Sequence, residues 1–253
     1  GGEGLSGTGP KAGGPHYLLR FVAPQLAGAA PAGEGAAPIA AATGLDLAAL
    51  AHAQSAWNDQ PLAQRVQLLE RAAAGQPGAV AQAWRAIGEQ ARQALREQTL
   101  PGPTGESNSL RLHGRGVIAV LAEGVDELAL AQALGAALVS GNAVAVCGGA
   151  APADGLVQAL LRGGLPAALL QRVPADQAPA LLAAEALHGV VAAADRLGAV
   201  HRRLAQREGA ILPLIAPSEA AELTQLYRFC AEQTLTINTA AAGGNAALLA
   251  GLH

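Results

Sequence analysis

From Arg115 onward, short apolar runs of strand length alternate with longer segments of helical character. Gly116–Ala122 and Ala143–Cys147 are continuous runs of small and branched apolar residues, and Asp126–Val139 between them has the length of a helix. Further strand candidates follow at Leu170–Val173, Gly189–Ala193 and Ala210–Ile215. Apolar strands joined by crossover helices indicate a mainly parallel sheet covered on both faces. The sequence of residues 109–233 therefore predicts an α/β fold with a Rossmann-like, doubly wound sheet.

A helical segment is predicted before this sheet, over residues 45–108. Two apolar stripes recur there at helical spacing. The first contains Leu62, Val66 and Leu69, and the second Val80, Trp84, Ile87 and Leu95. Pro61 suits a first helical position, with Asn58 or Asp59 as its cap. The two prolines of Leu100–Asn108 are expected to end the second helix.

Glycine, alanine and proline dominate the two ends of the chain. Residues 1–23 form a glycine-rich loop that runs into a strand-like stretch at His16–Val22, and residues 24–44 have the composition of a linker. Residues 234–253 carry too little apolar area for a core of their own. We expect this tail to dock in an extended form through its backbone, with an unattached terminus as the alternative. The predicted docking residues are Asn238, Thr239, Gly243, Gly244 and Asn245.

The composition excludes several classes of partner. A net charge of −3 with a single lysine, Lys11, argues against a nucleic-acid-binding face. Hydrophobic residues make up 51% of the chain, yet its most apolar stretches are interrupted before they reach the length of a membrane span. Two cysteines make neither a disulfide framework nor a zinc set, and no secretion signal is visible. We therefore expect a cytoplasmic protein that binds neither nucleic acid nor membrane, and a homo-oligomer stays possible.

Three stretches resemble the bacterial proline utilization A family, which joins a proline dehydrogenase to an L-glutamate γ-semialdehyde dehydrogenase. GGEGLSGTGPKAGGPHYLLRF at 1–21 is similar to the last loop and strand of the aldehyde dehydrogenase module, and LPGPTGESN at 100–108 to a segment after it. TLTINTAAAGGNAALL at 234–249 is similar to the C-terminal tail. Because the sequence also lacks methionine, we expect a piece of a longer protein. The resemblance implies that the parent oxidises proline with FAD and then the semialdehyde to glutamate with NAD.

Neither active site that the resemblance implies is complete in these residues. The proline dehydrogenase barrel is missing, as is the part of the aldehyde dehydrogenase with the nucleophilic cysteine and its general base. The remnant of the dehydrogenase loop is Gly2, Gly4, Ser6 and Gly7, and Ser6 is expected to form a turn, with substrate contact as the lesser alternative. We therefore expect no catalytic, cofactor-binding or metal-binding residue here, and NAD and FAD only elsewhere in the parent.

The middle of the chain resembles an aldehyde dehydrogenase nucleotide domain with altered loops. Where those enzymes place an oxyanion-holding Asn, this chain has Val125, which offers no donor. Where a Lys-Pro pair grips the adenosine ribose, it has Cys147-Gly148. Where backbone N–H groups face the pyrophosphate, it has Ala192–Asp195, and we expect Asp195 to cap its own helix. The resemblance thus implies a nucleotide domain that has lost its nucleotide.

The remaining reactive side chains favour structural roles. Cys230, expected on a helix, and Cys147 read as buried thiols, and the histidines lack metal-ligand spacing. Acidic residues at Glu123, Asp126 and Glu127 are typical of a helix start. A basic group is expected to form a solvated helix face, with an interdomain salt bridge as the lesser alternative; it comprises Arg202, Arg203 and Arg207.

We therefore expect a non-catalytic C-terminal domain of a bifunctional proline-catabolic enzyme. It would brace or cover the dehydrogenase module of its own polypeptide and the path along which the intermediate passes between active sites. A working NAD(P)-binding or regulatory domain with non-standard contacts is the alternative. A small independent enzyme that uses Cys230 as its nucleophile is a third hypothesis.

Overall fold

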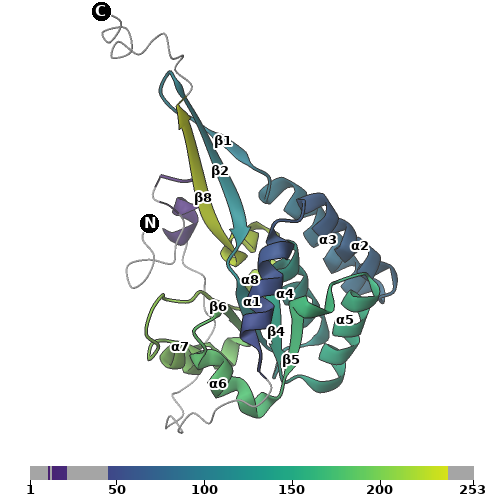
Figure 1. The fold of residues 1–253 in the computed structure, drawn as a ribbon. Coiled ribbons are helices and arrows are strands. Elements are labelled where there is room, and N and C mark those ends of the chain that lie inside the picture. Colours follow the sequence, from purple (N-terminus) through teal and green to yellow (C-terminus); the bar gives the residue numbers. More distant parts are fainter. Residues whose placement is uncertain (1–10, 12, 22–44, 239–253) are drawn as a thin grey trace, which may run out of the picture.

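A five-stranded parallel sheet lies at the centre of the computed structural model, which describes residues 11, 13–21 and 45–238 of the chain (Figure 1). Its strands are β3 (Val117–Leu121), β4 (Ala143–Cys147), β5 (Leu170–Val173), β6 (Leu187–Ala192) and β7 (Leu214–Ile215). Their order is β5-β4-β3-β6-β7, and each neighbouring pair is parallel. The chain therefore winds outward from β3 in one direction and from β6 in the other, which confirms the predicted doubly wound sheet.

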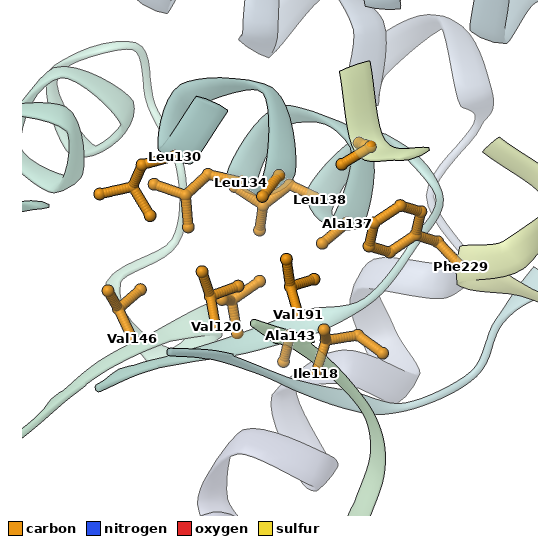
Figure 2. Close-up of a cluster of buried hydrophobic side chains, with 14 of the residues drawn as sticks. Ile118, Val120, Leu130, Leu134, Ala137, Leu138, Ala143, Val146, Val191 and Phe229 are labelled. Carbon is orange, nitrogen blue, oxygen red and sulfur yellow. The ribbon is translucent and has the colours of Figure 1, made fainter. Parts of the chain in front are cut away.

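The two central strands are covered on both faces, because every residue of β3 and β4 is buried. Helix α4 (Glu127–Val139) packs on one face, where Leu130, Leu134 and Leu138 point toward Ile118 and Val120 of β3 (Figure 2). Helix α1 (Leu47–Asn58) contacts β3 and β4, and α6 (Ala178–Ala183) contacts β3 and β6. The remaining crossover helices are α5 (Ala150–Arg162) and α7 (Leu197–Leu204). Continuous apolar strands fit this setting, since neither side of them faces water.

The helices that precede the sheet share its core. Helices α2 (Leu62–Ala74) and α3 (Gly78–Ala94) bury the two predicted apolar stripes, so those predictions are confirmed. Trp84 of α3 donates its indole N–H to the carbonyl of Ala131 at 2.7 Å, and Trp57 of α1 donates to Leu138 at 2.9 Å. Both tryptophans of the chain thus attach helices to α4, and one apolar cluster runs through all of them.

The predicted cap of α2 was wrong. Pro61 occupies the N-cap position and no side chain caps the helix. Asn58 ends α1, and Asp59 follows it as the C-cap. The side chain of Asn58 is used elsewhere, because its Oδ1 accepts the backbone N–H of Gly114 at 2.8 Å.

A second, antiparallel sheet projects from the body of the molecule (Figure 1). It consists of β1 (Gln98–Leu100), β2 (Glu106–Gly114) and β8 (Cys230–Asn238), in the order β1-β2-β8. This sheet corrects two predictions. Helix α3 ends at Ala94, before the prolines that were expected to end it, and residues 101–105 join β1 to β2. Cys230 begins a strand. The predicted helix at Cys230 is replaced by a short 3-10 helix, Leu223–Phe229, that ends just before it.

Two further strand predictions were wrong in extent or type. Tyr17–Phe21 forms a 3-10 helix. The strand predicted over Ala210–Ile215 is reduced to Leu214–Ile215, because Pro213 has no N–H to donate and only its carbonyl pairs, with Val190 N at 2.9 Å. A last short helix, α8 (Pro217–Ala221), contacts α4.

Most of the predicted docking and loop residues lie outside the described part of the chain. Asn238, the last described residue, pairs with Glu106 at the end of β8. The other docking residues (Thr239, Gly243, Gly244, Asn245) and the loop residues (Gly2, Gly4, Ser6, Gly7) fall beyond the described ranges. Within the residues that the structure describes, no helix is both long and apolar enough to cross a bilayer.

Candidate functional site

The carboxyl ends of β3, β4 and β6 face a cavity of about 500 Å³. It lies beside the point where the strand order reverses, which is where open α/β sheets bind their ligands. Its apolar lining comes from β3, α6 and the turn before it, and α7, and comprises Leu121, Ala175, Ala178, Pro179, Leu182, Ala199 and Val200. Its polar lining is Glu123, Cys147, Asp195, Arg196 and Arg203, from the loop after β3, the end of β4, the turn after β6 and α7. The cavity therefore combines an apolar slot with side chains of both charges.

The loop after β3 places a carboxylate beside the loop after β4. Glu123 Oε1 accepts the backbone N–H of Gly149 at 3.4 Å. Gly148 has a φ of +71°, and a Cβ there would lie 2.8 Å from the same oxygen, so this close approach needs glycine. Asp126 caps α4 by accepting the N–H of Ala129 at 2.9 Å, which confirms the predicted helix start for Asp126 and Glu127. The same prediction was wrong for Glu123, which lies in the loop before the helix.

The last residue of β4 carries a neutral thiol. Cys147 Sγ donates to the carbonyl of Pro174 at 3.3 Å, and burial raises its pKa to about 11. Arg172, which sequence reasoning missed, donates from Nη1 to the carbonyls of Val146 and Gly148 and from Nε to Asp154. This guanidinium is engaged with the end of β4 itself, so it is not free to bind a phosphate.

The loop after β6 holds Asp195, but the prediction that it caps its own helix was wrong. Ala193 precedes the 3-10 turn Ala194–Arg196, and Arg196 stands at the N-cap position of α7 without a side-chain hydrogen bond. Arg196 and Arg203 are seven residues apart, so they lie on the same side of α7 and both line the cavity. This spacing in the sequence could have predicted that the two arginines face one site.

The predicted solvated basic face is wrong for two of its three members. Arg202 is exposed, as predicted. Arg203 is half-buried and lines the cavity. Arg207 lies beyond α7 and donates to the carbonyls of Leu182 and Ala184 at 2.8 and 2.7 Å, so it caps the end of α6.

A dinucleotide fits these loops poorly. Glu123 already occupies the N–H of Gly149, and Asp195 adds a second carboxylate where a pyrophosphate would be repelled. The Cys147 thiol cannot replace an ammonium on the ribose. The cavity instead offers an apolar slot between α6 and α7, with Arg196 and Arg203 as its basic side chains.

Cys230, His113 and His188, other reactive side chains considered from the sequence, are held in the fold by packing and hydrogen bonds. Cys230 is 2% exposed, its Sγ donates to Leu226 O at 3.7 Å, and burial raises its pKa to about 11. His113 lies 2.6 Å from Gln233 Oε1, and His188 packs over Gly116. No group of His, Cys, Asp or Glu in the described part of the chain is arranged to hold a metal ion.

Comparison with curated proteins finds relatives that are much longer than this chain. No family model matches it. Bifunctional PutA from Salmonella typhimurium is 36% identical over 98% of this chain, and PutA from Escherichia coli is 35% identical over the same share. PutA from Rhizobium meliloti is 35% identical over 99% of the chain. The chain is homologous to a part of PutA. It spans only 17% of the length of the Salmonella and E. coli relatives.

Solved structures agree with this assignment. A crystal structure of Bradyrhizobium japonicum PutA is 29% identical with a TM-score of 0.61, covering 67% of this chain and 21% of that one. A salicylaldehyde dehydrogenase from Pseudomonas putida, 18% identical with a TM-score of 0.59, covers 67% of this chain and 42% of its own. The second likeness shows the fold alone, a Rossmann-like α/β fold.

Proposed function

We propose that this chain is a non-catalytic part of a bifunctional proline-catabolic enzyme that braces the L-glutamate γ-semialdehyde dehydrogenase module of its own polypeptide. It would also cover the path along which the semialdehyde passes between the two active sites of the parent. NAD and FAD would bind elsewhere in that parent enzyme, which we place in the cytoplasm.

The observation that carries this proposal is the content of the three loops at the carboxyl edge of the parallel sheet. Val125 offers no side-chain donor, the Cys147 thiol stays protonated at neutral pH, and Asp195 presents a carboxylate. The homologous scaffold is thus retained without groups suited to a dinucleotide. A domain that keeps its packing but not its ligand contacts is best explained by a role in contact with its neighbours.

The experiment is a truncation of the parent enzyme after Asn238. Residues up to Asn238 must stay, because Thr234–Asn238 pairs with Glu106–Leu110 and its removal would strip β2 of a partner. We expect removal of residues 239–253 to lower coupled turnover of proline to glutamate and to release free semialdehyde, while proline oxidation itself is unchanged. The matched control removes only residues 250–253. Coupled turnover equal to that of the intact enzyme would contradict the bracing role.

The cavity favours a second candidate, a domain that binds NAD(P) or another regulatory ligand through non-standard contacts. Arg196 and Arg203 face the cavity from one side of α7, and in the described residues neither forms an ion pair with an acidic side chain. Calorimetric titration of the folded chain with NAD and with NADP decides between the candidates. Saturable one-to-one heat that is lost in Arg196→Gln would favour the ligand-binding domain, and absence of heat would favour the brace.

A further inference from the structure

One carboxylate, Glu232 of β8, holds the described N-terminal segment, which comprises Lys11 and residues 13–21. Its Oε2 accepts the backbone N–H of Lys11 at 2.6 Å, and its Oε1 lies 2.8 Å from Nδ1 of His16. Because a carboxylate only accepts hydrogen bonds, Nδ1 carries the proton in this contact. The side chains of His16 and Glu232 are only 15% and 7% exposed. The contact is therefore largely shielded from water.

A tight turn brings both donors to the same carboxylate. Gly14 N–H donates to the carbonyl of Lys11 at 2.9 Å, and Gly13 within the turn has a φ of +79°. A Cβ on Gly14 would lie 3.1 Å from the Lys11 carbonyl and 3.5 Å from Glu232 Oε2. The glycine pair thus lets the backbone reverse directly against the carboxylate.

Flanking contacts extend this attachment along the C-terminal part of the chain. Lys11 Nζ donates to Thr234 Oγ1 at 3.3 Å, and Thr234 lies two residues beyond Glu232 on β8. The His16 ring stacks on Tyr227, with centroids 5.0 Å apart and planes 9° from parallel. The segment is therefore held on both sides of Glu232.

The N-terminal segment supplies the hydrogen bonds that the shielded carboxylate of Glu232 accepts. A shielded carboxylate is costly unless its oxygens accept hydrogen bonds, and bonds to a charged acceptor are stronger than those between neutral groups. Among the described residues, the partners of both oxygens, Lys11 and His16, belong to the N-terminal segment. They lie more than 200 positions from Glu232 in the sequence, so the contact joins the two ends of the chain.

We propose that Glu232 fastens the end of the dehydrogenase module onto the strand that leads into the tail. The identity of the segment as that end rests on the proposed function. Strand β8 carries the carboxylate near its start and finishes at Asn238, directly before residues 239–253. The fastening would set the position of the tail relative to the module that it serves.

The chain offers a direct test, because Lys11 is its only lysine and a lysine-specific endoprotease therefore has one cleavage site. Cleavage after Lys11 reports how often the segment leaves β8. Loss of two hydrogen bonds to a carboxylate in Glu232→Ala should raise the cleavage rate about tenfold or more. Glu232→Gln should give a smaller rise, since its amide oxygen still accepts from Lys11. The control is Glu97→Ala, which removes an exposed carboxylate paired with Arg111, and its rate should stay within about twofold.

A second variant keeps the test decisive if Glu232→Ala perturbs the whole fold. His16→Ala lies in the N-terminal segment and should raise the same rate while the melting temperature stays unchanged. The proposal would be overturned if the cleavage rates of both His16→Ala and Glu232→Ala stayed within about twofold of the rate for the unsubstituted chain. The proposal would also be overturned if the protease cleaved the unsubstituted chain as fast as it cleaves a free peptide with the sequence around Lys11. These readouts do not depend on turnover, so this proposal and the bracing role can fail separately.

Discussion

Asn142, in the turn between α4 and β4, connects three parts of the fold and is completely buried. Its Nδ2 donates to the carbonyls of Ala137 and Phe229, each at 2.9 Å. Its Oδ1 accepts the N–H of Gly116 at 3.1 Å, immediately before β3. One side chain thus joins the end of α4, the start of β3 and the segment that enters β8.

Replacing Asn142 by Ala should lower the free energy of unfolding by about 3 kcal/mol, at roughly 1 kcal/mol for each hydrogen bond. The acceptors are partly compensated, because Ala137 O keeps the backbone N–H of residue 142 and Phe229 O keeps that of Arg115. The Gly116 N–H has no such substitute among the described contacts, so it would be left buried and unpaired. This donor is expected to supply the largest share of the loss.

Equilibrium urea unfolding, followed by tryptophan fluorescence, measures this loss. Trp57 and Trp84 both bond to α4, so their emission reports on the region around Asn142. The control is Gln93→Ala, an exposed change on α3 that should stay within about 0.5 kcal/mol. A loss below about 1 kcal/mol for Asn142→Ala, with an unchanged dependence on urea, would refute the reasoning.

Two further predictions concern Gly141, in the turn between α4 and β4, and the two buried thiols. Gly141→Ala should lower the free energy of unfolding by more than about 2 kcal/mol, because φ is +92° there and the new Cβ would lie 2.2 Å from Arg65 Nη1. The control is Gly75→Ala, whose new Cβ meets no atom within 4 Å and which should change the melting temperature little. Burial raises the pKa of both thiols from 9.0 to about 11. Below pH 9 the thiols are protonated in folded and unfolded chains alike, so the free energy of unfolding should fall as pH rises from 9 to about 11. The double variant Cys147→Ala, Cys230→Ala should lack that part of the pH dependence. If its free energy of unfolding fell with pH as steeply as that of the unsubstituted chain, the prediction would be contradicted.

Apart from β7, the parallel sheet and α4 could be predicted from the sequence with nearly correct bounds. Ala143–Cys147 and Leu170–Val173 agree to the residue. The physical reason is local, because a strand buried on both faces must be apolar at every position, and its turns need Gly or a capping side chain such as Asp126. Such requirements are written in neighbouring residues.

The sheet β1-β2-β8 and the cavity were decided by tertiary structure. The outer half of β2, Glu106–Ser109, is polar and exposed or half-buried, and along its whole length it pairs with residues of β8 more than 120 positions away. In the sequence, Arg203 and Arg207 both look like members of one basic helix face. In the structure, Arg203 lines the cavity, whereas Arg207 donates a hydrogen bond to the end of α6. Glu232 shows the same limit, since nothing in its local sequence marks a carboxylate that Lys11 and His16 shield from water. Local propensity determined the elements of the parallel sheet, whereas contacts between distant segments determined which side chains meet.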